Sequence, residues 1–530
     1  MPKVMMNEDA VYERVIYEYL QMLDTDTIPT PAEIRDDLLN MLASEIDAVN
    51  ESLPKTAKFV RPRVLPPVII ALVMLKLYDI RRIVWGDELD EGELFIYQTT
   101  GDRKGIYVND ERFLKTIISE YSFRTSVQNT REVLECLSIR AKTVRVNNDP
   151  DLIPVNNGIF NYKTKELMPF SPEYIFTSKS AVDYNPCAKN VVIHNNEDNT
   201  DWDVDTWVGE LSDDKEIVDL LWQIIGASVR PYVLWEKVVC MYSEKGNNGK
   251  GTLCQLIRNL CGENSTRSMA FDEFDDDFAL ESLMRASAII TDENTTGVYI
   301  KETAALKAII TNDKFQVKRK FKTSVTMRFN GLMIQCINGL PKFGDKSESL
   351  YRRLMIVPFD KCFTGIQRKY IKHDYICRKD VLEYVLYKVL NTNYYTFDVP
   401  ERCVYELNEY KTFNDPIRDF LGEMLPELQW KLVPYAFLYD LYKAWFAKYG
   451  ANGQFKGKRV FINDVRNILD ESTEWQAPKN AVPTRDLMNE FEPLIITYDL
   501  NDWKSSYKGS DVKKICAFTR KSCYKGIVKI

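Results

Sequence analysis

The chain has 530 residues, of which 45% are hydrophobic and 28% charged, a composition that is ordinary for a globular protein and excludes low-complexity and disordered classes. This length exceeds what one compact core supports, so we expect two to four domains. The formal net charge of −7 is a whole-chain average, and it does not exclude a nucleic-acid binder whose basic residues are gathered on one surface.

The cysteines and histidines of the sequence limit the kinds of metal site and catalysis that we expect. The eleven cysteines include no Cys-x-x-Cys pair, and Cys516 and Cys523 have no histidine nearby, which argues against a structural zinc site. Only two histidines occur, and we interpret His194 and His373 as incidental, which removes histidine-based catalysis from consideration. The start lacks an apolar signal core, and the apolar run Val68–Leu75 is too short to span a membrane. We therefore expect a cytoplasmic protein with no membrane partner.

Residues 1–95 are predicted to form a helical region whose role the sequence does not indicate. Apolar residues recur at three- and four-residue spacings in Val11–Leu23 and in Pro31–Leu53, which predicts two amphipathic helices. Thr30 before Pro31 resembles a helix N-cap followed by proline at the first helical position.

Residues 96–205 are predicted to form a mixed α/β domain. Within Leu152–Pro186, turn residues at 156–158 and 163–165 separate short alternating segments, as expected of β-hairpins. The acidic, asparagine-rich stretch Asn195–Asp205 is predicted to be a surface loop before the next domain.

Residues 206–384 have the pattern of an α/β core. Val238–Tyr242 is a short apolar run typical of a strand buried on both faces, and Gly251–Gly262 follows it as a helix that stops at glycine. Ser287–Glu293 and Leu332–Asn338 are two more apolar strands that end in polar residues. Folds of this class bind ligands at the carboxyl ends of parallel strands, which is where these polar residues fall.

The segment between the first strand and the helix has the features of a phosphate-binding loop. Small residues let backbone N–H groups turn inward, a helix N-terminus favours phosphate, and a lysine reaches the terminal phosphates. The candidate nucleotide ligands are Gly246, Asn247, Asn248, Gly249, Lys250, Gly251 and Thr252. The usual pattern is broken where Glu244 replaces the first glycine and where Gly251 replaces the magnesium-binding hydroxyl residue, so Thr252 is a weaker metal candidate. A glycine-rich surface turn is the alternative.

Three further elements follow in the order that nucleotide hydrolases use. Asp292 and Glu293 end the second strand, where one carboxylate is suited to hold Mg²⁺ through water and the other to polarise the attacking water. Asn338 ends the third strand and is suited to sense phosphate. Arg352 and Arg353 precede another apolar strand, where one arginine is suited to reach a neighbouring subunit's ATP, and we prefer Arg353.

Basic residues crowd a predicted hairpin between the second and third strands. A hairpin that projects into a ring channel is suited to grip the phosphates of a single strand, although a solvated charged hairpin is an equal alternative. The candidate DNA contacts are Lys318, Arg319, Lys320 and Lys322.

Residues 385–530 are predicted to be a mainly helical, winged-helix-like DNA-binding domain with a basic tail. From Lys504 to Ile530 there are eight Lys or Arg against one Asp, interleaved with Trp503, Tyr507, Phe518 and Tyr524. A basic segment with aromatic residues is typical of DNA contact, and a merely solvated tail is the alternative.

Taken in this order, these elements resemble the superfamily 3 helicases, and in particular the phage and plasmid primase-helicase family with a poxvirus-type helicase domain. The resemblance spans roughly residues 95–465, including Leu152–Pro186 and Pro416–Gly450. It implies an AAA+-type P-loop ATPase core, a homo-hexameric ring, ATP and Mg²⁺, and 3′ to 5′ movement on single-stranded or forked DNA. By motif, Lys250 corresponds to the first-motif lysine and Asn338 to the polar sensor.

The resemblance also implies a phage or mobile-element replication protein in the cytoplasm of a bacterial host, with origin DNA as a further partner of the C-terminal region. Primases of that family need a carboxylate pair and a histidine, and the first hundred residues contain no histidine. We therefore expect a helicase that relies on a separate primase or polymerase. An origin-binding initiator with a weak motor and a protein-remodelling AAA+ ATPase are the alternatives.

Overall fold

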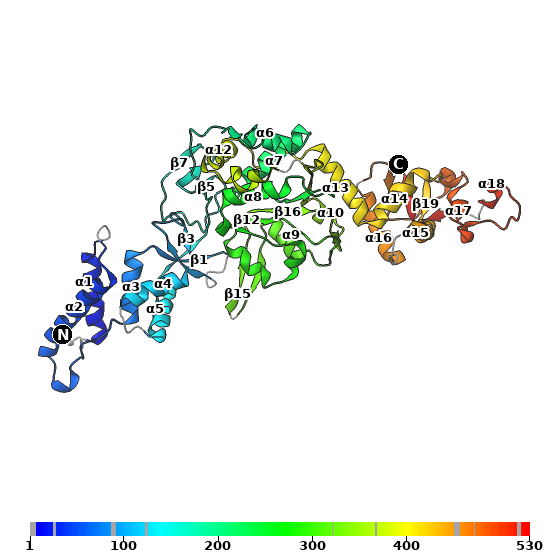
Figure 1. The fold of residues 1–530 in the computed structure, drawn as a ribbon. Coiled ribbons are helices and arrows are strands. Elements are labelled where there is room, and N and C mark those ends of the chain that lie inside the picture. Colours follow the sequence, from blue (N-terminus) through cyan, green and yellow to red (C-terminus); the bar gives the residue numbers. More distant parts are fainter. Residues whose placement is uncertain are drawn as a thin grey trace. The chain divides into compact units, whose positions relative to one another are not determined.

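The computed structural model describes residues 7–24, 28–85, 92–121, 126–320, 322–365, 368–449, 456–470, 472–516 and 521–530. The chain forms two compact units (Figure 1). Unit 1 contains residues 1–341 and 353–400, and unit 2 contains residues 342–352 and 401–530. Among the described residues, no helix has the length and apolar character needed to cross a membrane.

The first part of unit 1 is a helical core that shares one hydrophobic interior with a small sheet. Thr30 caps the second helix, because its hydroxyl accepts the backbone N–H of Glu33 while the Glu33 carboxylate accepts the Thr30 N–H. The sheet has the strand order β3-β2-β1-β4. The elements are α1 (Glu8–Met22), α2 (Pro31–Glu51), α3 (Pro67–Leu77), β1 (Ile80–Val84), β2 (Glu93–Tyr97), β3 (Tyr107–Val108), α4 (Glu111–Glu120), α5 (Val127–Arg140) and β4 (Lys142–Arg145).

The predicted helices and the capped start at Thr30 are confirmed, but the domain boundary expected after residue 95 falls inside β2. Strand β1 pairs with β2 on one side and with β4 on the other, so the sheet needs residues from both sides of that boundary. The helical core likewise continues to Ala141. The first structural region therefore extends to about residue 145.

A three-stranded antiparallel sheet follows, made of β5 (Leu152–Val155), β6 (Gly158–Asn161) and β7 (Glu166–Met168). It confirms the predicted hairpins. The stretch expected to be a loop instead contains the hairpin of β8 (Ile193–Asn195) and β9 (Thr200–Trp202), because Ile193 and Trp202 pair across it and are both buried.

Next to this sheet, one aromatic ring contacts two cations. The Lys165 Nζ and the Arg230 guanidinium each lie 3.5 Å from the centre of the Tyr162 ring. Lys165 also donates to the carbonyls of Leu390 (2.8 Å) and Thr392 (3.0 Å). These contacts join the three-stranded sheet to the core that follows.

The core of unit 1 is a five-stranded parallel sheet with the order β11-β12-β16-β10-β18. Each residue of β12, β16 and β18 is buried, which explains why these strands are mostly apolar rather than alternating, with Gln335 as a buried polar residue inside β16. Strand β16 lies between β10 and β12. The strands are β10 (Val238–Tyr242), β11 (Thr266–Arg267), β12 (Ala288–Thr291), β16 (Leu332–Ile337) and β18 (Leu354–Pro358).

Helices, the short strand β13 and one β-hairpin complete unit 1. Helix α12 packs against α7 and α8, so the boundary expected after residue 384 falls inside a helix of the core, and the unit continues to Pro400. Strands β14 and β15 form the predicted basic hairpin. The elements are α6 (Val204–Glu210), α7 (Lys215–Ser228), α8 (Lys250–Cys261), β13 (Tyr299–Ile300), α9 (Ala304–Ile310), β14 (Phe315–Arg319), β15 (Lys322–Met327), α11 (Lys369–His373) and α12 (Lys379–Leu390).

Unit 2 has its own core and a three-stranded antiparallel sheet with the order β19-β23-β20. Its elements in chain order are β17 (Lys342–Phe343), α10 (Glu348–Tyr351), α13 (Glu401–Asn414), α14 (Pro416–Glu427), β19 (Leu432–Pro434), α15 (Tyr435–Tyr449), α16 (Lys458–Leu469), β20 (Trp475–Gln476), β21 (Val482–Pro483), α17 (Leu494–Thr497), α18 (Val512–Ile515), β22 (Cys523–Tyr524) and β23 (Gly526–Lys529).

The basic tail expected after residue 504 is part of this folded unit. Strand β23 is the central strand of the sheet, with Ile527 fully buried, and Trp503 packs in the same core. Phe518 lies outside the described residues. Since β23 pairs on both edges, the segment 504–530 supports the fold as well as carrying charge.

The excursion at residues 342–352 is anchored in unit 2 by charged contacts. The Glu348 carboxylate accepts from Lys411 (2.7 Å) and Arg418 (2.6 Å), and Lys346 pairs with the buried Asp415 at 3.3 Å. The Asn414 amide also donates to the Tyr351 hydroxyl at 3.0 Å. The chain thus leaves unit 1 after β16 and returns to it at β18.

Candidate nucleotide-binding site

The loop between β10 and α8 is folded around a left-handed turn. Asn247 has a φ of +58° and Gly249 a φ of +86°, and helix α8 begins at the next residue. A Cβ at position 249 would lie 2.5 Å from Leu211 Cδ2, so glycine is required there for both conformation and space. The buried Asn248 donates to the Lys245 carbonyl at 2.6 Å. The loop therefore has the tight turn and the helix N-terminus that a phosphate needs.

Lys250 is the first residue of α8, and its ammonium is buried under the loop. Nζ donates to Asn338 Oδ1 at 2.9 Å and to the Ile337 carbonyl at 3.3 Å, both at the end of β16. The side chain is 5% exposed, and burial lowers the pKa of Lys250 below its ordinary value. Among the residues that the structure describes, no carboxylate pairs with Nζ, so an anionic ligand at this point would stabilise the charge.

Asp292 follows the end of β12, and one of its oxygens is held by the helix. Arg258 of α8 pairs through Nη1 with Asp292 Oδ2 at 2.8 Å and donates through Nη2 to the Ile290 carbonyl at 3.0 Å. Asp292 Oδ1 is buried and has no hydrogen-bond partner within the described parts of the chain. Glu293 is exposed beside it. A carboxylate oxygen of this kind fits a hydrated Mg²⁺, and Thr252 lies in the first turn of α8, the helix whose Arg258 holds the other Asp292 oxygen.

Asn294 fixes the segment after β12 against β16. Its amide donates to Gln335 Oε1 and to the Cys336 carbonyl, both at 3.0 Å, and its own Oδ1 accepts the Phe271 N–H. The sequence analysis did not identify Arg258 or Asn294. Both act across strands or helices that are distant along the chain, and an isolated Arg or Asn carries no motif.

A cavity of about 440 Å³ opens beside the loop. Asn247, Gly249 and Thr252 line it from the loop and from α8. Trp207, Phe363 and Ile371 add apolar side chains to its lining. A cavity with aromatic and aliphatic walls next to a phosphate-type loop has the size and character suited to a nucleoside triphosphate.

The same cavity carries several basic side chains and one carboxylate, that of Glu210, and Lys361 pairs with Asp213 at 2.7 Å; we did not predict this cluster from the sequence. His373, which we interpreted as incidental, lies on its wall together with Lys361, Arg368, Lys369 and Lys372. A Cβ at Gly251 would lie 3.7 Å from Lys372 Nζ, so this lysine stands directly over the first turn of α8. The segment at 361–373 follows β18, and only the parallel pairing of β18 with β10 places it beside the loop.

The segment after β18 is also tied to the loop by hydrogen bonds. The Phe363 N–H donates to the Asn247 carbonyl at 2.7 Å, and the Asn247 amide donates to the Thr364 hydroxyl at 3.3 Å. The loop residue Asn247 is thus held from outside, while Gly246 is exposed with open space around it.

The basic residues of the β14–β15 hairpin differ in their surroundings. The Arg319 side chain is only 7% exposed and pairs with Glu93, so its guanidinium is occupied within unit 1. Lys318 is exposed and pairs with Asp277, and Lys320 is exposed at the turn. Lys322 begins β15. The hairpin therefore presents Lys318 and Lys320 rather than Arg319.

Arg352 and Arg353 lie at the amino end of β18, whereas the loop follows the carboxyl end of β10. The two strands are parallel and pair from Val238 and Leu354 onward, so both arginines are at the opposite end of the sheet from the loop of their own chain. Arg352 is exposed, while Arg353 is 9% exposed and its carbonyl accepts the Val238 N–H. Its exposure therefore makes Arg352 the better candidate to reach a neighbouring subunit, whereas from the sequence we preferred Arg353 for this role.

Comparisons with known proteins agree with this arrangement in part. Residues 73–210 match a family described as D5 N terminal like, and residues 413–496 match one described as poxvirus D5 protein-like. Between them, residues 241–353 match a family of unknown function, DUF5906, and this stretch holds the loop, Asp292 and Asn338. The chain is thus similar to D5-type proteins on both sides of the candidate site. No curated protein matches it.

Solved structures that match this chain include three apo structures of the NrS-1 C-terminal region. Each is 14% identical to this chain, and each comparison covers 88% of this chain. The matches cover 99%, 100% and 99% of those chains, with TM-scores of 0.42, 0.41 and 0.39.

Proposed function

We propose that this chain, with its similarity to D5-type proteins on both sides of the loop, is an ATP-driven DNA helicase of the ring-forming kind, with a AAA+-type core. The observation that carries the proposal is the placement of Lys250. Among the described residues, its buried ammonium is held by two neutral oxygens alone, those of Asn338 and Ile337, at a loop beside a cavity lined by several basic side chains.

In this proposal ATP occupies the cavity with its base against Trp207, Phe363 and Ile371. Its phosphates meet the N-terminus of α8, where Lys250 turns from Asn338 to the terminal phosphates. Gly246, Asn247, Asn248, Gly249, Gly251 and Thr252 supply the cradle. Lys372, which lines the same cavity as His373, adds positive charge beside the first turn of α8, which compensates for the departures from the usual loop at Glu244 and Gly251.

The site also fits Mg²⁺, with Asp292 holding it through water and Thr252 as a second oxygen donor; when bound, it neutralises phosphate charge. Side chains of the protein carry out the proton transfer and orient the attacking water. Glu293, exposed next to Asp292, accepts a proton from the attacking water, and Asn338, released by Lys250, orients that water.

Arg352 serves the site of a neighbouring subunit in this proposal. It is exposed and lies at the end of the sheet opposite to its own loop, so it reaches ATP only across a subunit boundary. Arg353 remains the alternative. A homo-hexamer is the assembly that we propose, and electron microscopy of the ATP-bound protein in the presence of single-stranded DNA tests it.

Single-stranded DNA is the proposed track, gripped by Lys318 and Lys320 of the hairpin with Lys322 beside them and moved 3′ to 5′. The hairpin also discriminates between functions, because a protein remodeller more often has apolar or aromatic residues at such a tip. The proposed setting is replication of a phage or mobile element in a bacterial host, with a separate primase or polymerase as partner.

Unit 2 is the proposed reader of duplex or origin DNA. Its order of helix, strand, two helices, strand and late strand, with β23 in the middle of the sheet, supports a winged-helix-like domain. Helix α16 follows α15 and presents Lys458 and Arg459 to solvent at its start. This helix is a better candidate for DNA contact than the tail, whose last strand is built into the sheet.

One experiment separates the helicase from its alternatives. ATP hydrolysis is measured with and without single-stranded DNA, alongside unwinding of a forked duplex. We expect DNA-stimulated hydrolysis and unwinding in the natural protein, both lost in Lys250→Ala, and retained in Lys245→Ala, which removes an exposed loop lysine. Unwinding by Lys250→Ala would refute the assignment. Hydrolysis without unwinding would favour a protein remodeller, and DNA binding without hydrolysis an initiator.

A further inference from the structure

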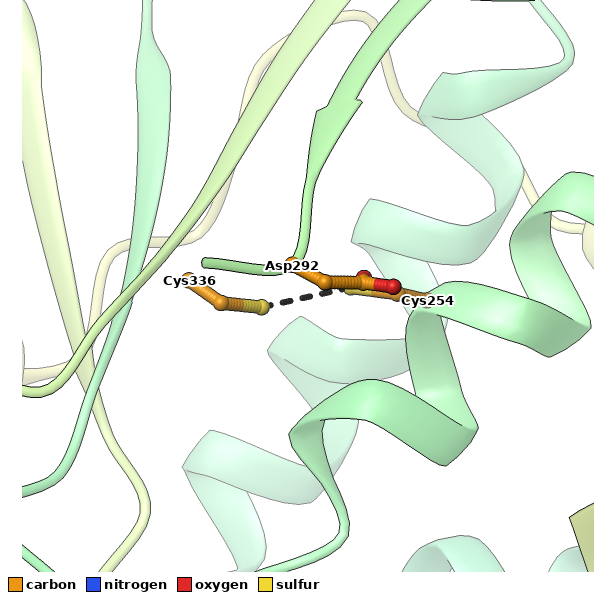
Figure 2. Close-up of side chains that lie close together, drawn as sticks. All are labelled: Cys254, Asp292 and Cys336. Atoms are coloured by element: carbon orange, nitrogen blue, oxygen red, sulfur yellow. Dashed lines mark hydrogen bonds between the residues drawn. The ribbon is translucent and has the colours of Figure 1, made fainter. Parts of the chain in front are cut away.

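Two buried thiols and one carboxylate meet beside the nucleotide loop (Figure 2). The Sγ atoms of Cys254 and Cys336 are 3.4 Å apart, and one donor atom from each of Cys254, Asp292 and Cys336 lies within 4.8 Å of the others. We propose that these three residues bind a thiophilic divalent cation such as Zn²⁺, and that the cation inhibits nucleotide hydrolysis by engaging Asp292.

The three residues come from three separate elements that the fold brings together. Cys254 lies on α8, one turn after Lys250, and Cys336 lies in β16, two residues before Asn338. Asp292 follows β12, which neighbours β16 in the sheet. Figure 2 shows the sulfur of Cys336 directed at Cys254, with the Asp292 carboxylate beside the latter. Because the ligands are far apart in the sequence, the lack of a Cys-x-x-Cys pair did not exclude this site.

The geometry suits a small tetrahedral cation. With zinc–ligand distances of about 2.0–2.3 Å, neighbouring ligands of a tetrahedral Zn²⁺ are about 3.3–3.8 Å apart, so the observed sulfur separation needs only a small adjustment. Asp292 Oδ1 is buried without a hydrogen-bond partner in the described residues, while Arg258 holds Oδ2. The site therefore has two soft ligands, one free oxygen and a fourth position left for water.

The ligand atoms of this site favour a different cation from the Mg²⁺ of the proposed reaction. Mg²⁺ prefers oxygen ligands and binds thiolates poorly, whereas Zn²⁺ and Cd²⁺ take thiolates readily. On binding, the cation replaces the two thiol protons, which leave to solvent, and forms two metal–sulfur bonds and one metal–oxygen bond. Both thiols are buried, but the Asp292 side chain is 39% exposed, which gives the cation a path from the nucleotide side.

The inhibitory consequence rests on the proposed function. Asp292 holds Mg²⁺ through water in that proposal, and a carboxylate committed to a buried Zn²⁺ is drawn toward β16 and away from the phosphates. The metal would also join α8 directly to β16, the two elements that Lys250 and Asn338 link a few residues away.

Metal binding is tested first, because it does not depend on activity. The full chain, kept reduced with a phosphine, is dialysed against Zn²⁺ with and without excess Mg²⁺, and Co²⁺ is used for its thiolate charge-transfer absorption. We expect one Zn²⁺ per chain that Mg²⁺ does not displace. Cys254→Ser/Cys336→Ser should weaken binding by more than about 100-fold, since loss of partners around metal ligands alone costs 10–100-fold. Cys261→Ser, a buried thiol on the same helix, should bind as the natural protein does.

Either of two results would overturn the site: no Zn²⁺ retained by the natural protein, or retention unchanged in the double serine variant. A thiolate absorption band that persists in the double variant would assign the metal to other cysteines. Should the serine variant fail to fold, Asp292→Asn provides the second test, because it keeps both thiols and should lower the stoichiometry or affinity alone.

Inhibition is tested separately with ATP hydrolysis at saturating Mg²⁺. Added Zn²⁺ should reduce the rate in the natural protein and in Cys261→Ser, and a chelator should restore it. The rate of Cys254→Ser/Cys336→Ser, whatever its baseline, should not change with Zn²⁺. Binding without any hydrolysis in the natural protein would refute the proposed function and leave the metal site standing, so the two failures are distinguishable.

Discussion

Lys250 Nζ donates a 2.9 Å hydrogen bond to Asn338 Oδ1, which joins the first residue of α8 to the end of β16. In Asn338→Ala the buried ammonium keeps only the Ile337 carbonyl, so we expect a loss of about 1–3 kcal/mol in the free energy of unfolding of unit 1. Lys250→Met removes the buried charge itself, so its stability should change little while ATP binding is lost.

A double-mutant cycle measures this contact. Since Lys250→Met already removes the donor, adding Asn338→Ala should cost much less than it does alone. Denaturant unfolding gives the stabilities, and a fluorescent ATP analogue gives the binding. Equal losses from Asn338→Ala in both backgrounds would show that the hydrogen bond contributes nothing.

Gly249 and Gly246 offer a matched pair of loop substitutions. Gly249→Ala introduces a Cβ 2.5 Å from Leu211 Cδ2 at a φ of +86°, so we expect a loss of about 1–3 kcal/mol together with loss of ATP binding. Gly246→Ala meets nothing within 4 Å, and its melting temperature should stay close to that of the natural protein.

The added variant Gly249→Ala/Leu211→Ala separates the two causes at this position. It relieves the clash but not the backbone strain, so it should recover only part of the affinity for ATP. Full recovery would mean that the left-handed turn is not needed.

Gly251 stands where the usual loop has a hydroxyl residue. A side chain there meets only Lys372 Nζ, at 3.7 Å, so Gly251→Ser should fit and should stabilise α8 by a few tenths of a kcal/mol. If Thr252 is the poorer magnesium ligand, the new hydroxyl should lower the Mg²⁺ concentration needed for half-maximal hydrolysis. A higher requirement in Gly251→Ser would assign the role to Thr252.

Lys165 makes the stability of unit 1 depend on pH. Burial, followed by repulsion from Arg230, lowers the pKa of Lys165 from 10.5 to about 8. Between pH 8 and 10.5 the unfolded chain therefore holds a proton that the folded chain lacks, so the contribution of this group to stability rises with pH. Thermal unfolding of the natural protein and of Lys165→Met should diverge in this window, with the natural protein gaining relative to the variant. A constant difference would contradict the lowered pKa.

Helix α16 and the tail of unit 2 make different predictions for duplex DNA. Lys458→Ala/Arg459→Ala should weaken binding and reduce the slope of log affinity against log salt by roughly 1.8, as expected for two lost phosphate contacts. Lys513→Ala/Lys514→Ala on α18 removes the same charge from the tail and should have a smaller effect. A larger effect from α18 would return the DNA contact to the tail.

Deleting residues 504–530 would not show whether α16 or the tail contacts duplex DNA. The deletion removes β23, the strand that pairs with both β19 and β20, together with the buried Ile527. We expect circular dichroism and limited proteolysis of the truncated chain to report an unfolded unit 2. A folded unit 2 after truncation would mean that β19 and β20 do not depend on the strand between them.

Much of the core was predictable because its signals are local. The buried strands β10, β12 and β16 are mainly apolar and are followed by polar residues, and the loop follows the first of them directly. Chain order alone placed Asp292 and Asn338 at the same edge of a sheet. It did not reveal that β16 lies between β10 and β12, which is what brings Asn338 to Lys250.

The contacts that we did not predict from the sequence join residues that are far apart along the chain. Arg258 reaches Asp292 over 34 residues, and Cys254 reaches Cys336 over 82. The cationic wall at 361–373 carries no motif of its own. The domain boundaries predicted after residues 95 and 384 differ from those of the structure for a similar reason. A change of composition along the chain does not show that β1 pairs with β4, or that α12 packs against α7 and α8.

The excursion at residues 342–352 has a mechanical consequence. Three covalent junctions, at 341/342, 352/353 and 400/401, connect the two units, where a simple tandem arrangement has one. The first junction is three residues after Asn338, and the second is the peptide bond between Arg352 and Arg353. A shift of β16 relative to β18 therefore pulls on both ends of a segment that Glu348 clamps to α13 and α14. A displacement of either strand is therefore passed to unit 2 through covalent bonds at two points, rather than through a single linker.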